Sequence, residues 1–335
     1  MRLALLVTSR CNASCIHCTT DSSPHKSLAL GGQRIKDLMT EAAALRARGD
    51  PLLFCISGGE PFLDFKQLLE TVSHGTALGG QVTCTTNGSW ASSDDRARSM
   101  LGALKEAGLY ALGVSTSQFH QEYVKPDRVR RALAIARGHG IKTILKCAVT
   151  KSDRKSGWAR SFARSVRPDK VEIFPVVPYL RSGAALPEDE YIRKPGLPRG
   201  RCPAAMLTIR EDGRAYTCCN PGGFVDALSL GNALDSGLEP AAEKFHTQAL
   251  QQVLIRRGPA YLAKAISAQG LGERLRSSYA DVCDLCAHIA GDKTLADIAV
   301  KVSEQFERER MKALFKAIPE LGRPARLDEP AVRDS

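Results

Sequence analysis

The sequence predicts an α/β protein, in which a parallel sheet forms a partial (β/α)6 barrel of the TIM type. A small C-terminal module with a β-hairpin and helices follows the barrel. Three observations support this prediction. Short apolar runs alternate with amphipathic stretches about six times between residues 1 and 180, which is typical of parallel strands joined by helices. The composition, with 43% hydrophobic and 25% charged residues, is that of an ordinary globular protein. From about residue 195 the repeat gives way to Gly- and Pro-rich loops.

The elements of the barrel follow from the apolar runs and from the glycines that end the stretches between them. Strands are expected at 3–8, 52–57, 81–86, 110–116, 142–150 and 170–177, and helices at 33–48, 65–74, 94–107, 127–138 and 156–165. Several of these helices end at a glycine, a common helix stop, as in Arg48-Gly49, Ala107-Gly108 and His139-Gly140.

The C-terminal part is predicted to contain a hairpin and then helices. The stretch MLTIREDGRAYTCCN (206–220) has Asp212-Gly213 between two apolar runs, a typical hairpin turn. A helical stretch over about 240–268 is interrupted at RRGP, and the pair of cysteines in DVCDLC (281–286) follows. We therefore divide the chain into a barrel (1–180), a second module (195–290), a C-terminal helix (291–319) and a disordered tail (320–335).

Unusual segments follow four consecutive predicted strands. These segments are CNASCIHC (11–18), SGGEP (57–61), TTNG (85–88) and STSQFH (115–120). In barrels of this type the chemistry takes place at the carboxyl ends of the strands. We therefore expect the four segments to form one site.

The chain contains eleven cysteines, and their clustered short spacings favour metal binding over disulfides. Residues Cys11, Cys15 and Cys18 form a C-x3-C-x2-C pattern. Iron–sulfur clusters normally have four thiolate ligands, so a set of three leaves one iron open to a substrate or cofactor. The cysteines inside apolar strand-like runs are interpreted as buried apolar residues. These are Cys55, Cys84 and Cys147.

The formal charge of +11 is compatible with nucleic acid, an acidic substrate or an anionic cofactor. The sequence has no basic run interleaved with aromatic residues, so nucleic-acid binding is not expected. No apolar run approaches the roughly 20 residues that span a bilayer. We therefore expect a cytoplasmic protein without a membrane partner.

The cysteine pattern after the first strand, together with GGEP after the second and the β/α repeat, resembles the radical S-adenosylmethionine (SAM) superfamily over residues 1–180. The resemblance implies a [4Fe–4S] cluster on Cys11, Cys15 and Cys18, with SAM on the open iron. It also implies that the segment of Gly58, Gly59, Glu60 and Pro61 meets the amino group of SAM, and that Ser115 contacts its ribose. Ser117 stands where this family often has Asp, and capping of the strand end is the alternative role for both serines.

The second module resembles a truncated SPASM, or twitch-like, domain that holds an auxiliary [4Fe–4S] cluster. The resemblance implies that the ligands of this cluster are Cys202, Cys218, Cys283 and Cys286. A structural zinc ion is the alternative occupant of four such cysteines.

One cysteine, Cys219, remains beside Cys218. Adjacent side chains of a strand point to opposite faces. If Cys218 faces the auxiliary cluster, Cys219 faces away from it, and its thiol could give a hydrogen atom to a carbon radical. The opposite arrangement, with Cys219 as the ligand, and a purely packed Cys219 are the alternatives.

The resemblance implies that one electron cleaves SAM and that the resulting 5′-deoxyadenosyl radical takes a hydrogen atom from the substrate. We expect a precursor peptide as substrate and a flavodoxin or ferredoxin as electron donor. The segments CCN (218–220), SLGN (229–232) and RRGP (256–259), with the late C-x2-C, resemble a ribosomal-peptide epimerase. The favoured reaction is therefore epimerisation of an L residue to D, with hydrogen return from Cys219. Two-electron oxidation, as in a dehydrogenase or a cross-linking enzyme, is the first alternative, and a Cys-rich metal module that binds nucleic acid is the second. Lys146 and Arg181 could reach the carboxylate of SAM or an acidic peptide.

Overall fold

The computed structural model describes residues 1–178 and 185–321. Its main feature is a sheet of nine strands in the order β10-β9-β8-β1-β2-β3-β4-β5-β6. The first six strands are parallel, as expected from the repeat. They are β1 (Arg2–Leu6), β2 (Leu53–Ser57), β3 (Gln81–Thr86), β4 (Leu109–Thr116), β5 (Lys142–Val149) and β6 (Lys170–Pro175).

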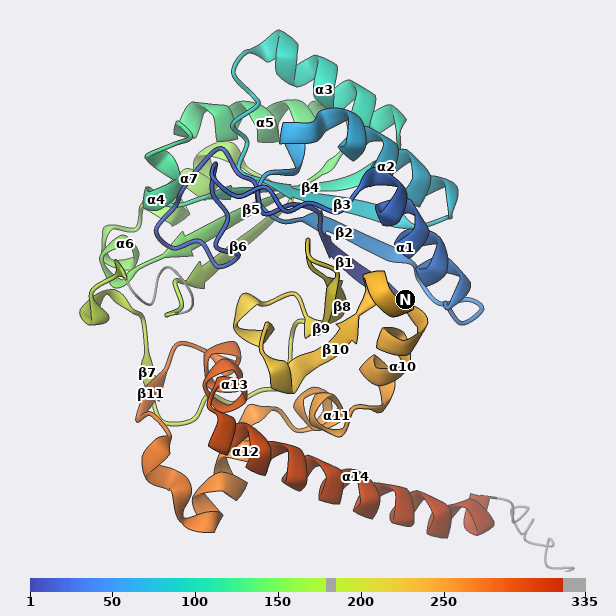
Figure 1. Ribbon diagram of the computed structural model, residues 1–335. Helices are drawn as coiled ribbons and strands as arrows, with labels where there is room; N and C mark the ends of the chain where they lie inside the picture. The colour runs from blue at the N-terminus through green and yellow to red at the C-terminus, as the bar shows by residue number, and fades with distance from the viewer. Residues whose placement is uncertain (179–184, 322–335) are drawn as a thin grey trace, which may run out of the picture.

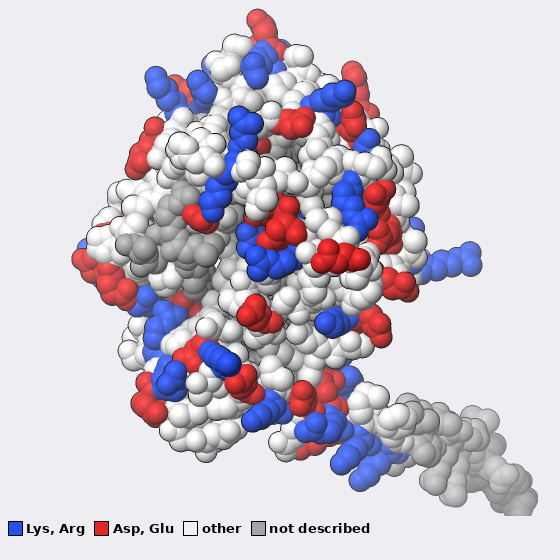
Figure 2. All heavy atoms as spheres, in the orientation of Figure 1, with Lys and Arg blue, Asp and Glu red and all other residues white. Residues whose placement is uncertain are grey.

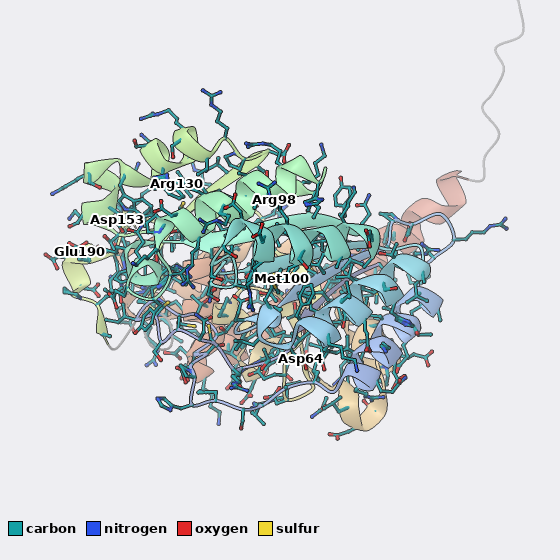
Figure 3. The ribbon with its side chains drawn as sticks, turned by 90° about the horizontal axis from the view of Figure 1, so that it is seen from above. Asp64, Arg98, Met100, Arg130, Asp153 and Glu190 are labelled. Atoms are coloured by element: carbon teal, nitrogen blue, oxygen red, sulfur yellow. The ribbon has the colours of Figure 1, made fainter. Side chains whose placement is uncertain are left out.

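The helices between these strands cover one face of the sheet (Figure 1). Seen from above, the helices that carry the labelled residues Arg98, Met100 and Arg130 form an outer layer (Figure 3). The helices of this part are α1 (Gly32–Ala44), α2 (Phe65–Ala77), α3 (Asp94–Glu106), α4 (Gln118–Gln121), α5 (Pro126–Gly138), α6 (Lys151–Ser156) and α7 (Trp158–Val166). The helix expected at 156–165 starts later, because Gly157 adopts a left-handed conformation with φ of 70° and separates α6 from α7.

The hairpin of the second module extends the sheet of the barrel. Strand β8 (Ala205–Ile209) pairs parallel with β1, and β9 (Arg214–Cys218) and β10 (Ser229–Asn232) continue the sheet in antiparallel fashion. The turn lies at Asp212-Gly213, as expected, and Gly213 has a φ of +82°. The hairpin and the barrel strands are therefore parts of one continuous sheet.

Four helices of the C-terminal part pack around a second hydrophobic core. They are α11 (Ala249–Arg256), α12 (Pro259–Ile266), α13 (Val282–Gly291) and α14 (Lys293–Leu321). The buried residues of α9 (Ala233–Ser236) and α10 (Glu239–Thr247) belong instead to the core of the barrel. A separate two-stranded sheet joins β7 (Lys194–Pro195) to β11 (Ser278–Tyr279). The far end of α14 projects from the body of the molecule (Figure 1). The tail expected to be disordered lies outside the described residues from 322 onward, and Arg181 also lies outside them.

The two faces of the sheet differ. On β2 the alternate residues Phe54 and Ile56 are buried in the core beneath the helices, whereas Cys55 is only half-buried on the opposite, interior face. The prediction that Cys55 is a buried core residue is therefore wrong, because its place in the alternation puts it on the other face. The same prediction is confirmed for Cys84 and Cys147, which are 1% and 0% exposed.

Two observations concern the partners that the sequence makes unexpected, nucleic acid and a membrane. Acidic residues lie among the Lys and Arg side chains over the face shown in Figure 2. Within the described residues, no helix combines the length and the apolar character needed to cross a bilayer.

Candidate functional site

The four segments that follow the first four strands meet at one end of the sheet. The amide of Gly59 donates to the carbonyl of Thr8 at 2.6 Å, and the amide of Glu60 donates to the carbonyl of Arg10 at 2.9 Å. A side chain on Gly59 would collide with the backbone of Arg10. The glycine thus allows the GGEP segment to lie directly against the start of the cysteine loop.

Glu60 fastens the GGEP segment to the end of β3. Its carboxylate is 1% exposed and accepts hydrogen bonds from the Thr86 hydroxyl at 2.7 Å, the Asn87 amide at 2.8 Å and the Phe62 amide at 3.1 Å. The last of these bonds caps the short helix Pro61–Asp64. Sequence reasoning missed this positioning role. The expected contact between the GGEP segment and the amino group of SAM stays a prediction.

Burial raises the pKa of Glu60 to about 7, from an ordinary value of 4.5. Between these two values the folded protein binds more protons at this site than the unfolded chain does. The free energy of unfolding should therefore fall as the pH rises from 4.5 to 7 and level off above 7.

We expect Glu60→Gln to remove this dependence. Denaturant unfolding of the metal-free protein at several pH values should give a wild-type free energy that falls by about 3 kcal/mol relative to the variant over this range. Parallel pH profiles for the two proteins would contradict the assignment.

Asn87, in the TTNG segment, connects the end of β3 to the cysteine loop. Its side-chain amide donates to the sulfur of Cys11 at 3.6 Å and to Oδ1 of Asn12 at 2.9 Å. The amide of Ser22 donates to the sulfur of Cys18 at 3.3 Å. Hydrogen bonds to ligand sulfurs orient them and tune the potential of a cluster.

The cysteine loop itself is largely buried. Cys11 is 9% and Cys15 is 6% exposed. Burial raises the pKa of the Cys11 thiol to about 11 and that of Cys15 to about 12. The three thiols share a small apolar cluster with Phe119 and Ala148. The triplet is therefore a set of soft ligands in a place from which water is mostly excluded.

The segment after β4 contacts the same loop through a pair of histidines. The ring of His17 stacks on Phe119 at 4.9 Å between centroids, and Ser117 Oγ lies 2.8 Å from His120 Nδ1 and 3.4 Å from His17 Nε2. Burial lowers the pKa of His17 to about 3 and that of His120 to about 4. Ser117 also caps α4, the alternative role considered for it. His17, inside CNASCIHC, was the available sequence signal for this contact.

Ser115 precedes this cluster on the interior face of β4. It is half-buried and pairs in register with Lys146 of β5. Lys146 Nζ lies 3.8 Å from Glu172 Oε2, and Gly113 leaves the room that the lysine side chain occupies. The expected contacts of Ser115 and Lys146 with SAM or a peptide stay predictions.

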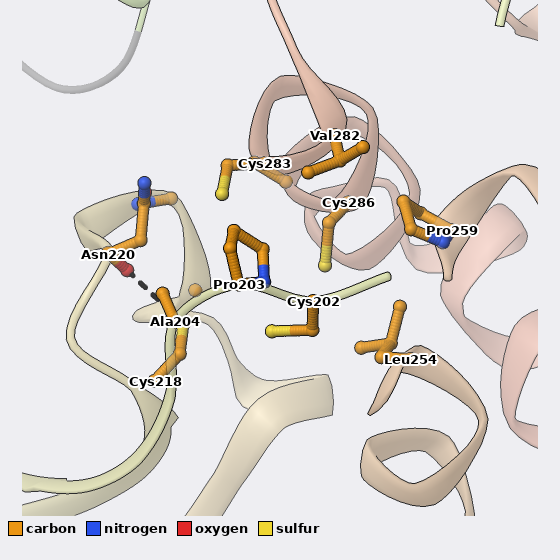
Figure 4. A pocket seen from close by; sticks show the side chains of 13 residues that line it. Cys202, Pro203, Ala204, Cys218, Asn220, Leu254, Pro259, Val282, Cys283 and Cys286 are labelled. Atoms are coloured by element: carbon orange, nitrogen blue, oxygen red, sulfur yellow. Dashed lines mark hydrogen bonds between the residues drawn. The ribbon is translucent and has the colours of Figure 1, made fainter. Parts of the chain in front are cut away.

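A second site lies in the C-terminal part, where four cysteines line one hollow of about 350 Å³. We call it the thiol hollow (Figure 4). The four are Cys202, Cys218, Cys283 and Cys286, the residues expected for the auxiliary cluster. Within the described part of the chain, no three His, Cys, Asp or Glu side chains are grouped closely enough to hold a single metal ion.

Gly223 forms a tight wall of the thiol hollow. A Cβ at this position would lie 2.5 Å from the sulfur of Cys218. The sulfur must therefore move if any side chain is added there.

We expect Gly223→Ala to displace Cys218 and to lower the iron content of the reconstituted protein from about eight atoms toward about four. Gly291→Ala is the matched control, because no atom lies within 4 Å of its added Cβ. Iron analysis and absorbance of protein reconstituted without oxygen measure the effect. Equal iron in both variants would show that the hollow tolerates the methyl group.

Cys218 and Cys219 have different environments. Cys218 is 9% exposed in the thiol hollow, whereas Cys219 is exposed and does not line it. The pKa of the Cys219 thiol is raised, first by desolvation and then by its neighbour Cys55 on the interior face of β2. Cys219 therefore lies outside the thiol hollow, within electrostatic reach of Cys55 and Lys146 on the interior face of the sheet and of Cys283 in the hollow.

Comparisons with known proteins agree with this geometry. Residues 5–150 match the family described as the radical SAM superfamily. This part of the chain is a radical SAM domain. The match favours the radical SAM interpretation over a non-catalytic Cys-rich module.

The similarity to known proteins extends beyond the radical SAM domain and covers most of the chain. A Bacillus subtilis (strain 168) protein with the name "Putative peptide biosynthesis protein YydG" is 23% identical over 316 residues, which cover 92% of this chain and 98% of that protein. The structure of native anSMEcpe with bound AdoMet has 14% identity and a TM-score of 0.55, and the match covers 90% of this chain and 100% of that one. The same protein with AdoMet and the Cp18Cys peptide gives a TM-score of 0.54 at 14% identity, over 90% and 99% of the two chains. These structures confirm the predicted fold.

Proposed function

We propose that this protein is a radical SAM enzyme that modifies a ribosomally synthesised peptide, and that it converts an L residue into its D epimer. The peptide substrate is supported by the name of the relative YydG and by the similarly folded anSMEcpe, which was solved with a bound peptide. Epimerisation is supported by the position of the Cys219 thiol.

The cysteine triplet fits a cluster with an open iron. Cys11, Cys15 and Cys18 would hold a [4Fe–4S] cluster, and Gly58 to Pro61 with Ser115 would contact SAM. When bound, this pair supplies a carbon radical able to remove a hydrogen atom from a substrate. The chain itself contributes the hydrogen bonds of Asn87 and Ser22 to the ligand sulfurs, and the burial that excludes water.

The thiol hollow fits an auxiliary [4Fe–4S] cluster better than a zinc ion. A zinc ion binds four sulfurs at about 2.3 Å from one point, which requires the thiols to converge closely. The four cysteines line one hollow, yet among the described residues no three such side chains converge closely enough to hold a single metal ion. Cys202, Cys218, Cys283 and Cys286 would hold the cluster, which leaves Cys219 without a ligand role.

The observation that carries epimerisation is that Cys219, unlike Cys218, does not line the thiol hollow and has Cys55 and Lys146 as electrostatic neighbours. After a hydrogen atom leaves the α-carbon of the peptide, the S–H bond of Cys219 breaks and a new C–H bond forms on the opposite face of that carbon. A thiyl radical remains on Cys219, and one electron and one proton restore the thiol. The electron comes from an external one-electron carrier of the flavodoxin or ferredoxin class.

The surroundings of Cys219 suit hydrogen-atom transfer. Its raised pKa keeps the sulfur protonated near neutral pH, and only the protonated thiol has a hydrogen atom to give. The Lys146–Glu172 pair on the interior face offers both charges to the backbone or termini of a peptide. The interior is therefore equipped to hold a peptide close to the donor.

Deuterium incorporation tests the reaction. Short peptides encoded beside this gene are tested as substrates in D2O, with the reconstituted protein and dithionite. Epimerisation should add one deuterium to the α-carbon of the inverted residue, without any other change in mass. A product that has lost two hydrogens would replace this proposal with two-electron oxidation.

A further inference from the structure

The outer surface of the C-terminal part carries a hollow lined by basic side chains, with an empty volume of about 740 Å³. We call it the basic hollow. Its basic residues are Arg199, Arg201, Arg256, Arg257 and Lys264, with Gly200, Ala260 and Tyr261 between them. All five basic side chains are exposed, and none of the residues that line the hollow is acidic.

The positive charge of the basic hollow is largely unneutralised. Arg256 lies 4.0 Å from Glu307, at the limit of an ion pair. No ion pair with a described residue is found for the other four basic side chains. Arg257 lies over the rings of Tyr261 and Phe306, at 5.2 and 6.0 Å from their centroids, which fixes the direction of its guanidinium. The surface is thus a preformed, strongly positive concavity.

The basic hollow and the thiol hollow are the two sides of one wall. Residues 199–204 and 254–260 form this wall, with the basic residues on one side and Cys202 and Leu254 on the other. The amide of Cys202 donates to the carbonyl of Leu254 at 2.9 Å. Gly258 lies so close to the backbone of Gly200 that a side chain would not fit. The same two segments therefore line both hollows.

We propose that the basic hollow is the docking surface for a small acidic protein that carries single electrons. This inference rests on the proposed function, because it assigns the auxiliary cluster to the thiol hollow. Opposite charges steer such partners together and give short-lived complexes of small area. A carrier seated in the basic hollow has its redox group on the other side of this wall from the four thiols.

The position of the basic hollow argues against the peptide substrate as its occupant. None of the residues that line it belongs to a barrel strand, whereas Cys219 has Cys55 and Lys146, both on barrel strands, as electrostatic neighbours. A peptide bound in the basic hollow would lie on the far side of the wall from the thiol hollow. An electron carrier needs no direct access to the reacting carbon.

The test is the binding of a flavodoxin with its flavin mononucleotide to the reconstituted full-length protein. Anaerobic titration calorimetry compares the wild type with the double variant Arg199→Glu/Lys264→Glu, because neither of these charged groups forms an ion pair or a ring contact with a described residue. We expect the affinity to fall about tenfold or more and the salt dependence to become flatter. The matched control, Arg160→Glu/Arg164→Glu on α7, makes the same change of charge at exposed positions and should bind like the wild type.

Two results would overturn the docking surface. One is equal affinity of the wild type and the double variant for flavodoxin. The other is a double variant that still binds flavodoxin like the wild type but no longer binds the precursor peptide or a DNA duplex. Iron content and SAM cleavage driven by dithionite report on the proposed function without any carrier. If the wild type binds no iron or does not cleave SAM, the proposed function is wrong. If the charge reversal still weakens flavodoxin binding in that case, the docking surface is supported on its own.

Discussion

Replacing Cys219 with Ala is expected to abolish formation of the D residue while SAM cleavage continues. The variant keeps Cys11, Cys15 and Cys18 and the four cysteines of the thiol hollow, so both proposed clusters should form. Without the S–H bond the peptide radical has no donor on the opposite face. Chiral amino-acid analysis of the peptide should show a loss of epimer of at least about a hundredfold, corresponding to about 2.7 kcal/mol or more in the barrier of hydrogen return. The release of 5′-deoxyadenosine should stay within a few-fold of the wild type.

Cys55→Ala provides the matched control for this experiment. Cys55 is a second thiol on the interior face and an electrostatic neighbour of Cys219, so its loss changes the surroundings of Cys219 without removing the proposed donor. We expect this variant to retain epimerisation. If Cys219→Ala still inverts the residue, or if Cys55→Ala abolishes inversion in its place, the donor has been assigned to the wrong sulfur.

The second large effect concerns the cysteine triplet. Cys15→Ala should eliminate the release of 5′-deoxyadenosine, because two remaining thiols cannot hold a cluster with one defined open iron. The iron content should fall from about eight atoms to about four, since the thiol hollow keeps its own four ligands. Electron paramagnetic resonance of the reduced wild type should contain a signal that changes when SAM is added. That signal should be missing from the variant.

Cys84→Ala is the corresponding control for loss of a buried thiol. Cys84 is 1% exposed in the core beneath the helices, and it is not one of the proposed cluster ligands. Its replacement should lower stability by roughly 1 kcal/mol and leave both the iron content and the SAM-dependent signal unchanged. A Cys15→Ala protein that cleaves SAM at the wild-type rate would refute the assignment of the triplet.

The fold could be predicted because its signals are local. Strands such as β3 (Gln81–Thr86) and β5 (Lys142–Val149) begin and end within a residue or so of the predicted runs. Periodicity and glycine stops act within a few residues, so they can be read directly from the chain. The pairing of β8 with β1 joins residues about 200 positions apart. No local pattern contains that information.

The site was predictable only in part, for a related reason. The cysteine spacing and GGEP identified segments that do meet at one end of the sheet. Residue type alone, however, does not specify what a side chain contacts. Glu60 carries a charge suited to an ammonium group, yet its carboxylate is engaged by Thr86 and Asn87. Cys55 was assigned to the core because its strand is apolar, although alternation could have placed it on the interior face. Alternation separates the two faces of a strand, but in an apolar run only the position of the helices decides which face belongs to the core.

The hairpin β8–β9 continues the sheet of the barrel, and the vicinal cysteines stand where β9 ends. Side chains alternate along a strand. Whether an odd or an even number of residues follows the turn at Asp212-Gly213 therefore decides which of the two sulfurs faces the thiol hollow. The pairing of β8 with β9 already contains an irregularity between Ala205 and Thr208, so an inserted residue matters only where it moves the register of β9. A shift of one residue would exchange the two thiols, and a shift of two would restore them. Natural variation that moves this register should therefore occur in even steps.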